Sequence, residues 1–289
     1  MNSDWSSQGY TVSSGVRLDL RYDDSDQTTL REGTRDVARG AFAFPNDQEI
    51  QQETLNRVAT LGVDFSPSRD WGLDFELPEI DRYHMTVAPG DTAVSAARVR
   101  GAGDARLLAR YQGLAVDGST GLQFGLKLPT GQFGDNFDSG PQAGNLLDRG
   151  LQAGSGTADL LLGLYQFGNF SPDLGWFAQA LGEKALNERE GYRPGASLNL
   201  GAGLRCTTWR WIVPQLQVNA RFEGRESGIE ADVANSGSST VYLSPGFSLP
   251  VVRNRLDAYT FVELPVYQRV NGLQLEPRWL LSIGLRYRL

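Results

Sequence analysis

Apolar and polar side chains alternate with a period of two along most of the chain. Consecutive side chains of an extended strand point to opposite faces, so each such segment has one apolar and one polar face. The C-terminal segment is the clearest example. One of its faces carries Trp279, Leu281, Ile283, Leu285, Tyr287 and Leu289, and the other carries Arg278, Leu280, Ser282, Gly284, Arg286 and Arg288. This pattern predicts a strand between two chemically different environments.

About twelve segments of this kind follow one another along the chain. A soluble two-layer sheet could show the same alternation once or twice, in half-buried strands, but not along nearly the whole chain. The connections alternate in length. Short links rich in turn-forming or polar residues occupy 66–70, 115–120, 169–174, 207–211 and 250–255. Long polar links occupy 23–52, 80–102, 129–156, 184–194, 224–238 and 269–275. Short periplasmic turns that alternate with long extracellular loops are typical of outer-membrane barrels.

These features predict an all-β fold: a closed antiparallel transmembrane β-barrel of about 12 strands in a bacterial outer membrane. Closure is required because an open sheet edge facing hydrocarbon would leave backbone N–H and C=O groups unpaired. An even number of strands places both termini on the periplasmic side. We expect a single barrel domain over residues 1–289, with residues 1–13 as an N-terminal periplasmic segment.

Composition excludes several other classes of protein. Charged residues make up 21% of the chain, and no apolar run approaches the ~20 residues of a membrane-spanning helix. One His, one Cys and two Met provide little material for metal or thiol chemistry, so we predict no metal site and no cofactor. The net charge of -7 argues against a nucleic-acid partner.

Four motifs resemble a known family. They are GDARLLARYQ (103–112), LKLPTG (126–131), LQAGSGTADLLLGL (151–164) and the terminal LLSIGLRYRL. Over residues 54–289 the chain resembles the outer-membrane transporters associated with the phenol meta-degradation pathway. The resemblance implies a barrel and the passage of apolar or aromatic solutes. The terminal strand, with Tyr287 near its end, also resembles the signal read by the barrel-assembly machinery, although Leu289 replaces the more usual aromatic residue.

The polar faces of the predicted strands supply the candidate site, because they line the lumen. The predicted lining residues are Arg17, Asp19, Arg21, Asp74, Glu76, Arg106, Arg110, Lys127, Asp159, Glu183, Arg205, Arg221, Glu263, Arg278, Arg286 and Arg288. Twelve strands enclose a narrow lumen, in which charges must pair or stay hydrated. Strands three and four should place Asp74 near Arg110 and Glu76 near Arg106. These charges either select solutes or stiffen the wall as a salt-bridge network.

At the closing seam, Arg17 and Arg21 should lie beside Arg286 and Arg288. Because Asp19 alone cannot neutralise this cluster, we expect it either to recruit an acid from across the lumen or to bind an anion at the periplasmic mouth.

Three functions fit the sequence. The first is a channel or facilitator for a small solute, gated by the long loops or by the N-terminal segment. The second is a structural or adhesive barrel, or a sheath around a partner protein. The third is an outer-membrane hydrolase, which the sequence disfavours because the single histidine, His84, has no matching serine motif. We expect no enzymatic activity, and we expect His84 to be an ordinary residue of an external loop. The expected partners are outer-membrane lipid, the assembly machinery and an unidentified solute.

Overall fold

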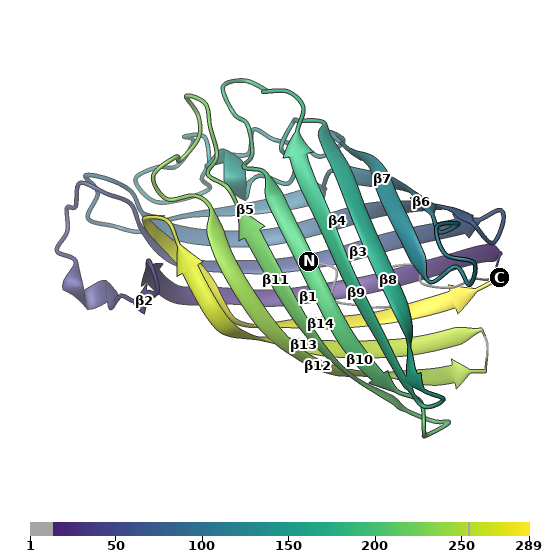
Figure 1. Ribbon diagram of the computed structural model, residues 1–289. Helices are drawn as coiled ribbons and strands as arrows, with labels where there is room; N and C mark the ends of the chain where they lie inside the picture. The colour runs from purple at the N-terminus through teal and green to yellow at the C-terminus, as the bar shows by residue number, and fades with distance from the viewer. Residues whose placement is uncertain (1–13, 254) are drawn as a thin grey trace.

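The computed structural model describes residues 14–253 and 255–289, which form a closed antiparallel barrel of twelve strands with two further strands attached (Figure 1). The barrel strands are β1 (Gly15–Glu32), β3 (Ile50–Ser66), β4 (Trp71–Val87), β6 (Ala105–Tyr111), β7 (Thr120–Leu128), β8 (Asp159–Ser171), β9 (Leu174–Ala185), β10 (Ser197–Cys206), β11 (Val213–Glu223), β12 (Ser238–Val252), β13 (Leu256–Val270) and β14 (Leu273–Arg288). The attached strands are β2 (Arg35–Asp36), paired with β1, and β5 (Ser95–Ala102), paired with β4. Two short 3₁₀ helices span Arg39–Ala41 and Arg149–Leu151. The expected N-terminal segment, 1–13, lies outside the described residues.

Strands β14 and β1 close the barrel, and their register runs from Arg17 opposite Arg288 to Glu32 opposite Leu273. The predicted closed all-β barrel of about twelve strands is therefore confirmed. Among the described residues, no helix has the length and apolar content needed to cross a bilayer.

The predicted alternation matches the observed burial. Outward apolar side chains are exposed, as Leu20 (55%) and Leu164 (57%) illustrate, whereas the inward Arg21 (6%) and Tyr165 (0%) are covered by other strands. An exposed apolar band on a closed sheet is the surface that lipid tails would cover.

All five predicted short turns lie at one end of the barrel, which we call the short-turn end. The opposite end, the long-loop end, departs from prediction in three places. In the predicted loop 23–52, residues 23–32 belong to β1 and 50–52 belong to β3. Most of 80–102 is strand, because β4 continues to Val87 and pairs with β5. The predicted loop 269–275 is a two-residue connection, Asn271 and Gly272, in which Gly272 adopts the positive φ (62°) of a tight turn.

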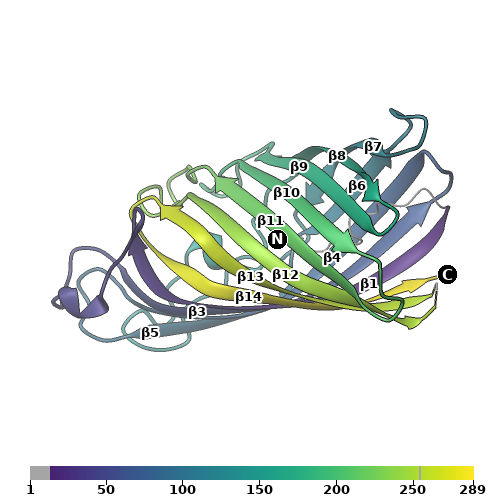
Figure 2. The ribbon, with the colours of Figure 1, turned by 60° about the horizontal axis from the view of Figure 1, so that its bottom comes forward.

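The wall is uneven in height (Figures 1 and 2). Strands β1, β3 and β4 have 18, 17 and 17 residues, whereas β6 and β7 have 7 and 9. Where the wall is short, the segment between β7 and β8 folds against the β4–β5 hairpin. It is held there by a buried apolar cluster of Ala97, Val99, Leu147 and Ala153, with Ile80, Phe137 and Leu151 at its edge. This packing brings the 3₁₀ helix Arg149–Leu151 to the mouth of the lumen.

Candidate functional site

The lumen contains three adjoining spaces along the barrel axis. A loop-side cavity of about 550 Å³ lies under the long loops. A central cavity of about 590 Å³ follows, and a constriction of about 20 Å³ lies beyond it, toward the short-turn end. Neighbouring spaces share lining residues: Arg82 and Arg149 border both cavities, and Arg21 and Glu76 border both the central cavity and the constriction.

Most of the predicted lining residues border one of these spaces. The constriction is lined by Arg17, Asp19, Arg21, Asp74, Glu76 and Arg286. The central cavity is also lined by Arg106, Arg110, Lys127, Glu183 and Arg221, and Asp159 borders the loop-side cavity. The others lie elsewhere: Glu263 is buried at 1% exposure, Arg205 is exposed at the end of β10, and Arg288 pairs with Asp257 near the end of β14.

Arg278 corrects the prediction. Ser25 of β1 lies opposite Leu280 of β14, and Gln27 lies opposite Pro277. β14 therefore advances three residues where β1 advances two, which is a β-bulge. The bulge breaks the alternation. Arg278 is exposed, donates to the Thr29 hydroxyl and borders none of the three spaces.

Asp64 organises the narrow part of the lumen. Its two carboxylate oxygens accept hydrogen bonds from Arg17 Nη2 (2.8 Å) and Arg110 Nη1 (2.6 Å). All three side chains are buried, with Arg110 at 3% exposure and Asp64 at 7%. One carboxylate from β3 therefore ties together guanidinium groups from β1 and β6.

The seam arginines find acids on nearby strands. Arg17 lies opposite Arg288, as predicted. However, Arg17 pairs with Asp64 of the adjacent β3, Arg286 with Asp19 of the adjacent β1 (3.1 Å), and Arg21 with Asp23 of its own strand (2.7 Å). Each of these acids lies on the same strand or on an adjacent one, rather than across the lumen as expected, because those positions are closer.

The predicted partners of Arg106 and Arg110 also differ. Strands β4 and β6 pair with Glu76 opposite Arg106, as the sequence suggested. Yet Arg106 pairs with Glu183 of β9 (2.7 Å), and Arg110 pairs with Asp64. Inside a curved sheet, inward side chains converge, so long side chains reach beyond the adjacent strand.

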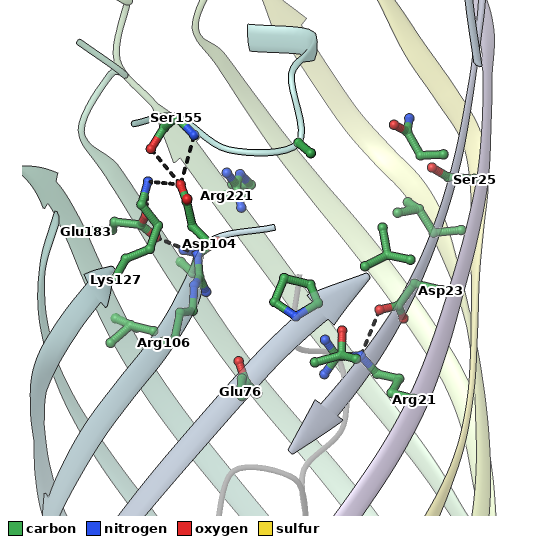
Figure 3. Close-up of a pocket in the computed structure, with 18 of the residues that line it drawn as sticks. Arg21, Asp23, Ser25, Glu76, Asp104, Arg106, Lys127, Ser155, Glu183 and Arg221 are labelled. Carbon is green, nitrogen blue, oxygen red and sulfur yellow. Dashed lines mark hydrogen bonds and ion pairs between the residues drawn. The ribbon is translucent and has the colours of Figure 1, made fainter. Parts of the chain in front are cut away.

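A second charged cluster lies on the wall formed by β7, β8 and β9 (Figure 3). Lys127 Nζ is 2.5 Å from Asp159 and 3.6 Å from Glu183, and it is 3.7 Å from Asp104. Asp104 in turn accepts hydrogen bonds from the backbone N–H and the hydroxyl of Ser155. The cluster thus fixes the segment before β8 to the barrel wall.

Four buried aromatic side chains fill the short-turn half, and the sequence analysis missed their role. Each lies directly opposite a glycine on the paired strand. The pairs are Tyr165 with Gly121, Phe177 with Gly203, Phe261 with Gly246, and Tyr259 with Gly284. In each pair, a Cβ on the glycine would lie 2.1 to 2.4 Å from the aromatic ring. An inward glycine opposite an inward aromatic residue is the signal that could have identified them.

His84 is placed differently from expectation. It lies in β4, one of the long strands, and is 1% exposed. Its Nδ1 is 2.8 Å from the Thr54 hydroxyl, and its Nε2 is 3.8 Å from Glu49. The expected external-loop position was wrong because β4 continues well beyond the predicted loop boundary at residue 80.

Acidic side chains gather at the long-loop end, where Asp148, Glu226 and Asp232 border the loop-side cavity. Restricted hydration within the mouth, together with the negative charges of Glu49, Asp232 and Glu226, raises the pKa of Asp148 to about 7. Asp148 is therefore mainly charged above that pH and mainly neutral below it.

This titration predicts a pH-dependent ion selectivity. Protonation of Asp148 removes a negative charge from the mouth, so the ratio of anion to cation permeability should rise as the pH falls from 8.5 to 5.5. Reversal potentials of the reconstituted barrel under a KCl gradient measure this ratio. Asp148→Asn should show the high ratio already at pH 8.5, and Asp117→Asn, in a turn at the other end, should behave like the unmodified protein. An unchanged pH profile in Asp148→Asn would contradict the assignment.

No model of a known protein family matches the chain, and no curated protein matches it in sequence. Its fold is nevertheless similar to solved structures. An outer membrane channel from Pseudomonas putida F1 superimposes with a TM-score of 0.68 at 10% identity, over 96% of this chain and 97% of that one. The beta domain of the Bordetella autotransporter BrkA superimposes with a TM-score of 0.54 at 14% identity, over 96% and 100%. The chain therefore has the fold of an outer-membrane β-barrel.

Proposed function

We propose that this protein is a channel of the bacterial outer membrane that admits a small solute from the long-loop end and passes it toward the short-turn end. The observation that carries the proposal is the pair of adjoining cavities, about 550 and 590 Å³, beneath the loops. Cavities of this size accommodate a small organic molecule. The apolar outer band and the barrel's similarity in fold to an outer membrane channel support the same role.

The constriction acts as the selective step in this proposal. Side chains joined by ion pairs border it, and these pairs must separate or be displaced for a solute to pass. The solute class is proposed to be small and at least partly apolar, in keeping with the resemblance to transporters linked to phenol degradation. Leu108, Leu181 and Leu280 give the central cavity an apolar part for such a solute.

Single-channel conductance and solute uptake into liposomes test the proposal. Changing Asp19 and Arg286 together to Ala removes an ion pair from the constriction without leaving either charge unpaired, and should increase conductance severalfold. The matched control changes Asp81 and Arg98, an ion pair of 2.7 Å on the β4–β5 extension, to Ala and should leave conductance unchanged. A barrel that remains impermeable to ions and to phenol, with and without the constriction pair, would contradict the channel function.

That last outcome would favour a structural barrel. The buried aromatic side chains and the narrow constriction in the short-turn half are the features that support this second candidate. We do not propose an enzymatic role, because His84 is buried against Thr54 and Glu49 and borders none of the three spaces.

A further inference from the structure

The passage between the loop-side and central cavities is surrounded by positive charge. The cationic side chains that border both cavities are Arg82, Arg106, Lys127, Arg149 and Arg221, whereas Glu183 is the only carboxylate to do so among the described residues. We call this ring of six side chains the neck. It draws on β4, β6, β7, β9, β11 and the segment before β8, so it encircles much of the lumen.

Three of the cations are matched by acids. Arg106 pairs with Glu183 and Lys127 pairs with Asp159. Arg221 pairs with Glu223 on its own strand. These three groups therefore contribute little uncompensated charge to the passage.

Arg82 and Arg149 are different, because their hydrogen bonds go to neutral acceptors. Arg82 Nε donates to Asn56 Oδ1 (2.6 Å), and its Nη1 lies 3.4 Å from the Gly150 carbonyl and 3.3 Å from that of Gln152. Arg149 Nη2 donates to the Ser155 carbonyl (3.0 Å). Within the described ranges 14–253 and 255–289, neither guanidinium has a carboxylate within 4 Å.

Packing holds Arg149 in place. It is 5% exposed, and its guanidinium carbon lies 4.0 Å from the Phe133 ring centre and 5.3 Å from that of Tyr192. The hydrogen bond from Arg82 to the Gly150 carbonyl places the Arg82 guanidinium beside the residue that follows Arg149. Two neighbouring cations with restricted hydration and no acid are costly unless an anion joins them.

The loop acid Glu226 forms no ion pair with either arginine. Its carboxylate accepts a hydrogen bond from the Tyr192 hydroxyl (2.7 Å). Burial and the neighbouring charges of Asp232 and Glu223 raise the pKa of Glu226.

We propose that Arg82 and Arg149 form a binding site for the carboxylate of a small organic acid at the neck. Arg82 Nη2 and Arg149 Nη1 make no hydrogen bond to the described part of the chain and are available to a ligand oxygen. Guanidinium groups bind carboxylates through strong charge-assisted hydrogen bonds. The apolar part of the acid would contact Leu280 at the neck and Leu181 in the central cavity. This inference rests on the proposed channel function and specifies its solute class.

Binding of benzoate to the full-length barrel in detergent, measured by titration calorimetry, tests the site directly. Benzyl alcohol, a neutral molecule of similar size, is the comparison ligand. The unmodified protein should bind benzoate saturably and more tightly than benzyl alcohol. Arg82→Gln and Arg149→Gln should each weaken benzoate binding about tenfold, because each removes one charged hydrogen-bonding partner. Neither variant should change the binding of benzyl alcohol. Arg225→Gln, at an exposed loop arginine that donates to the Val233 carbonyl, should have no effect.

Equal benzoate affinity in the unmodified protein and in the Arg82→Gln/Arg149→Gln double variant would overturn the inference. If the Gln variants fail to fold, as judged by heat-dependent gel migration, Arg82→Lys and Arg149→Lys replace them in the experiment. These variants retain the positive charge but lose the planar, forked guanidinium. They should bind benzoate more weakly than the unmodified protein, and unchanged affinity would again overturn the site. Liposome uptake separates the two proposals: passage of benzyl alcohol without benzoate binding contradicts only the anion site, whereas no passage of either molecule contradicts the channel.

Discussion

Asp64→Asn should destabilise the barrel by about 3 to 5 kcal/mol, because it leaves two buried guanidiniums without their shared carboxylate. Arg17 and Arg110 would keep their charges in a region with little water. Denaturant unfolding of the detergent-solubilised protein, followed by tryptophan fluorescence, measures the loss.

A matched control and a compensating variant distinguish this cause from a general loss of packing. Asp257→Asn removes the partner of the more exposed Arg288 and should cost less than about 1 kcal/mol. Replacing Arg17, Asp64 and Arg110 together with Met, Leu and Met should recover most of the stability, since no unpaired charge remains. If the triple variant is as unstable as Asp64→Asn, unpaired charge is not the cause.

Gly246→Val should prevent assembly of the barrel or destabilise it by about 3 kcal/mol or more, at the severe end of overpacking. A Cβ at this position would lie 2.2 Å from the Phe261 ring and 2.4 Å from the backbone oxygen of Thr260. The backbone atom cannot be removed by mutation, so adding Phe261→Ala should not restore folding. The yield of folded barrel after refolding, read from heat-dependent gel migration, measures the effect.

Gly284 offers an informative contrast. A Cβ there would meet the Tyr259 side chain at 2.1 Å, and the three nearest atoms all belong to that side chain. Gly284→Ala should therefore reduce the folded yield, and Tyr259→Ala should restore it in the double variant. Ala202→Val, on the exposed face of β10, is the control and should fold normally. Normal folding of Gly246→Val would show that the strands can separate enough to accept the side chain.

The barrel could be predicted from the sequence because lipid and lumen impose opposite demands on alternate residues of each strand. Strand ends were harder to predict. The end of β4 around His84 pairs with β3 and β5. Its residues do not continue the regular alternation of apolar and polar residues from earlier in the strand, so the sequence there resembles a loop. A bulge likewise reverses the face of Arg278, and no local pattern marks where the register shifts.

Ion-pair partners were predictable only in part. The pairing of adjacent strands could be predicted from the order of the segments, and Arg17 lies opposite Arg288 as predicted. The pair of Arg106 with Glu183 joins β6 to β9, three strands further along, and depends on the curvature of the closed wall. The neck depends on the segment containing Arg149, whose position is fixed by tertiary packing rather than by strand periodicity.

The seam between β1 and β14 also constrains how the molecule can form. It joins residues from opposite ends of the sequence, such as Leu18 with Tyr287, so the search for this contact spans nearly the whole polypeptide. Folds dominated by such distant contacts form slowly, since the entropy of loop closure is lost before the contact is gained. Until that last step, the intermediate has two unsatisfied edges, and a chain shortened at either terminus would remain in this aggregation-prone condition.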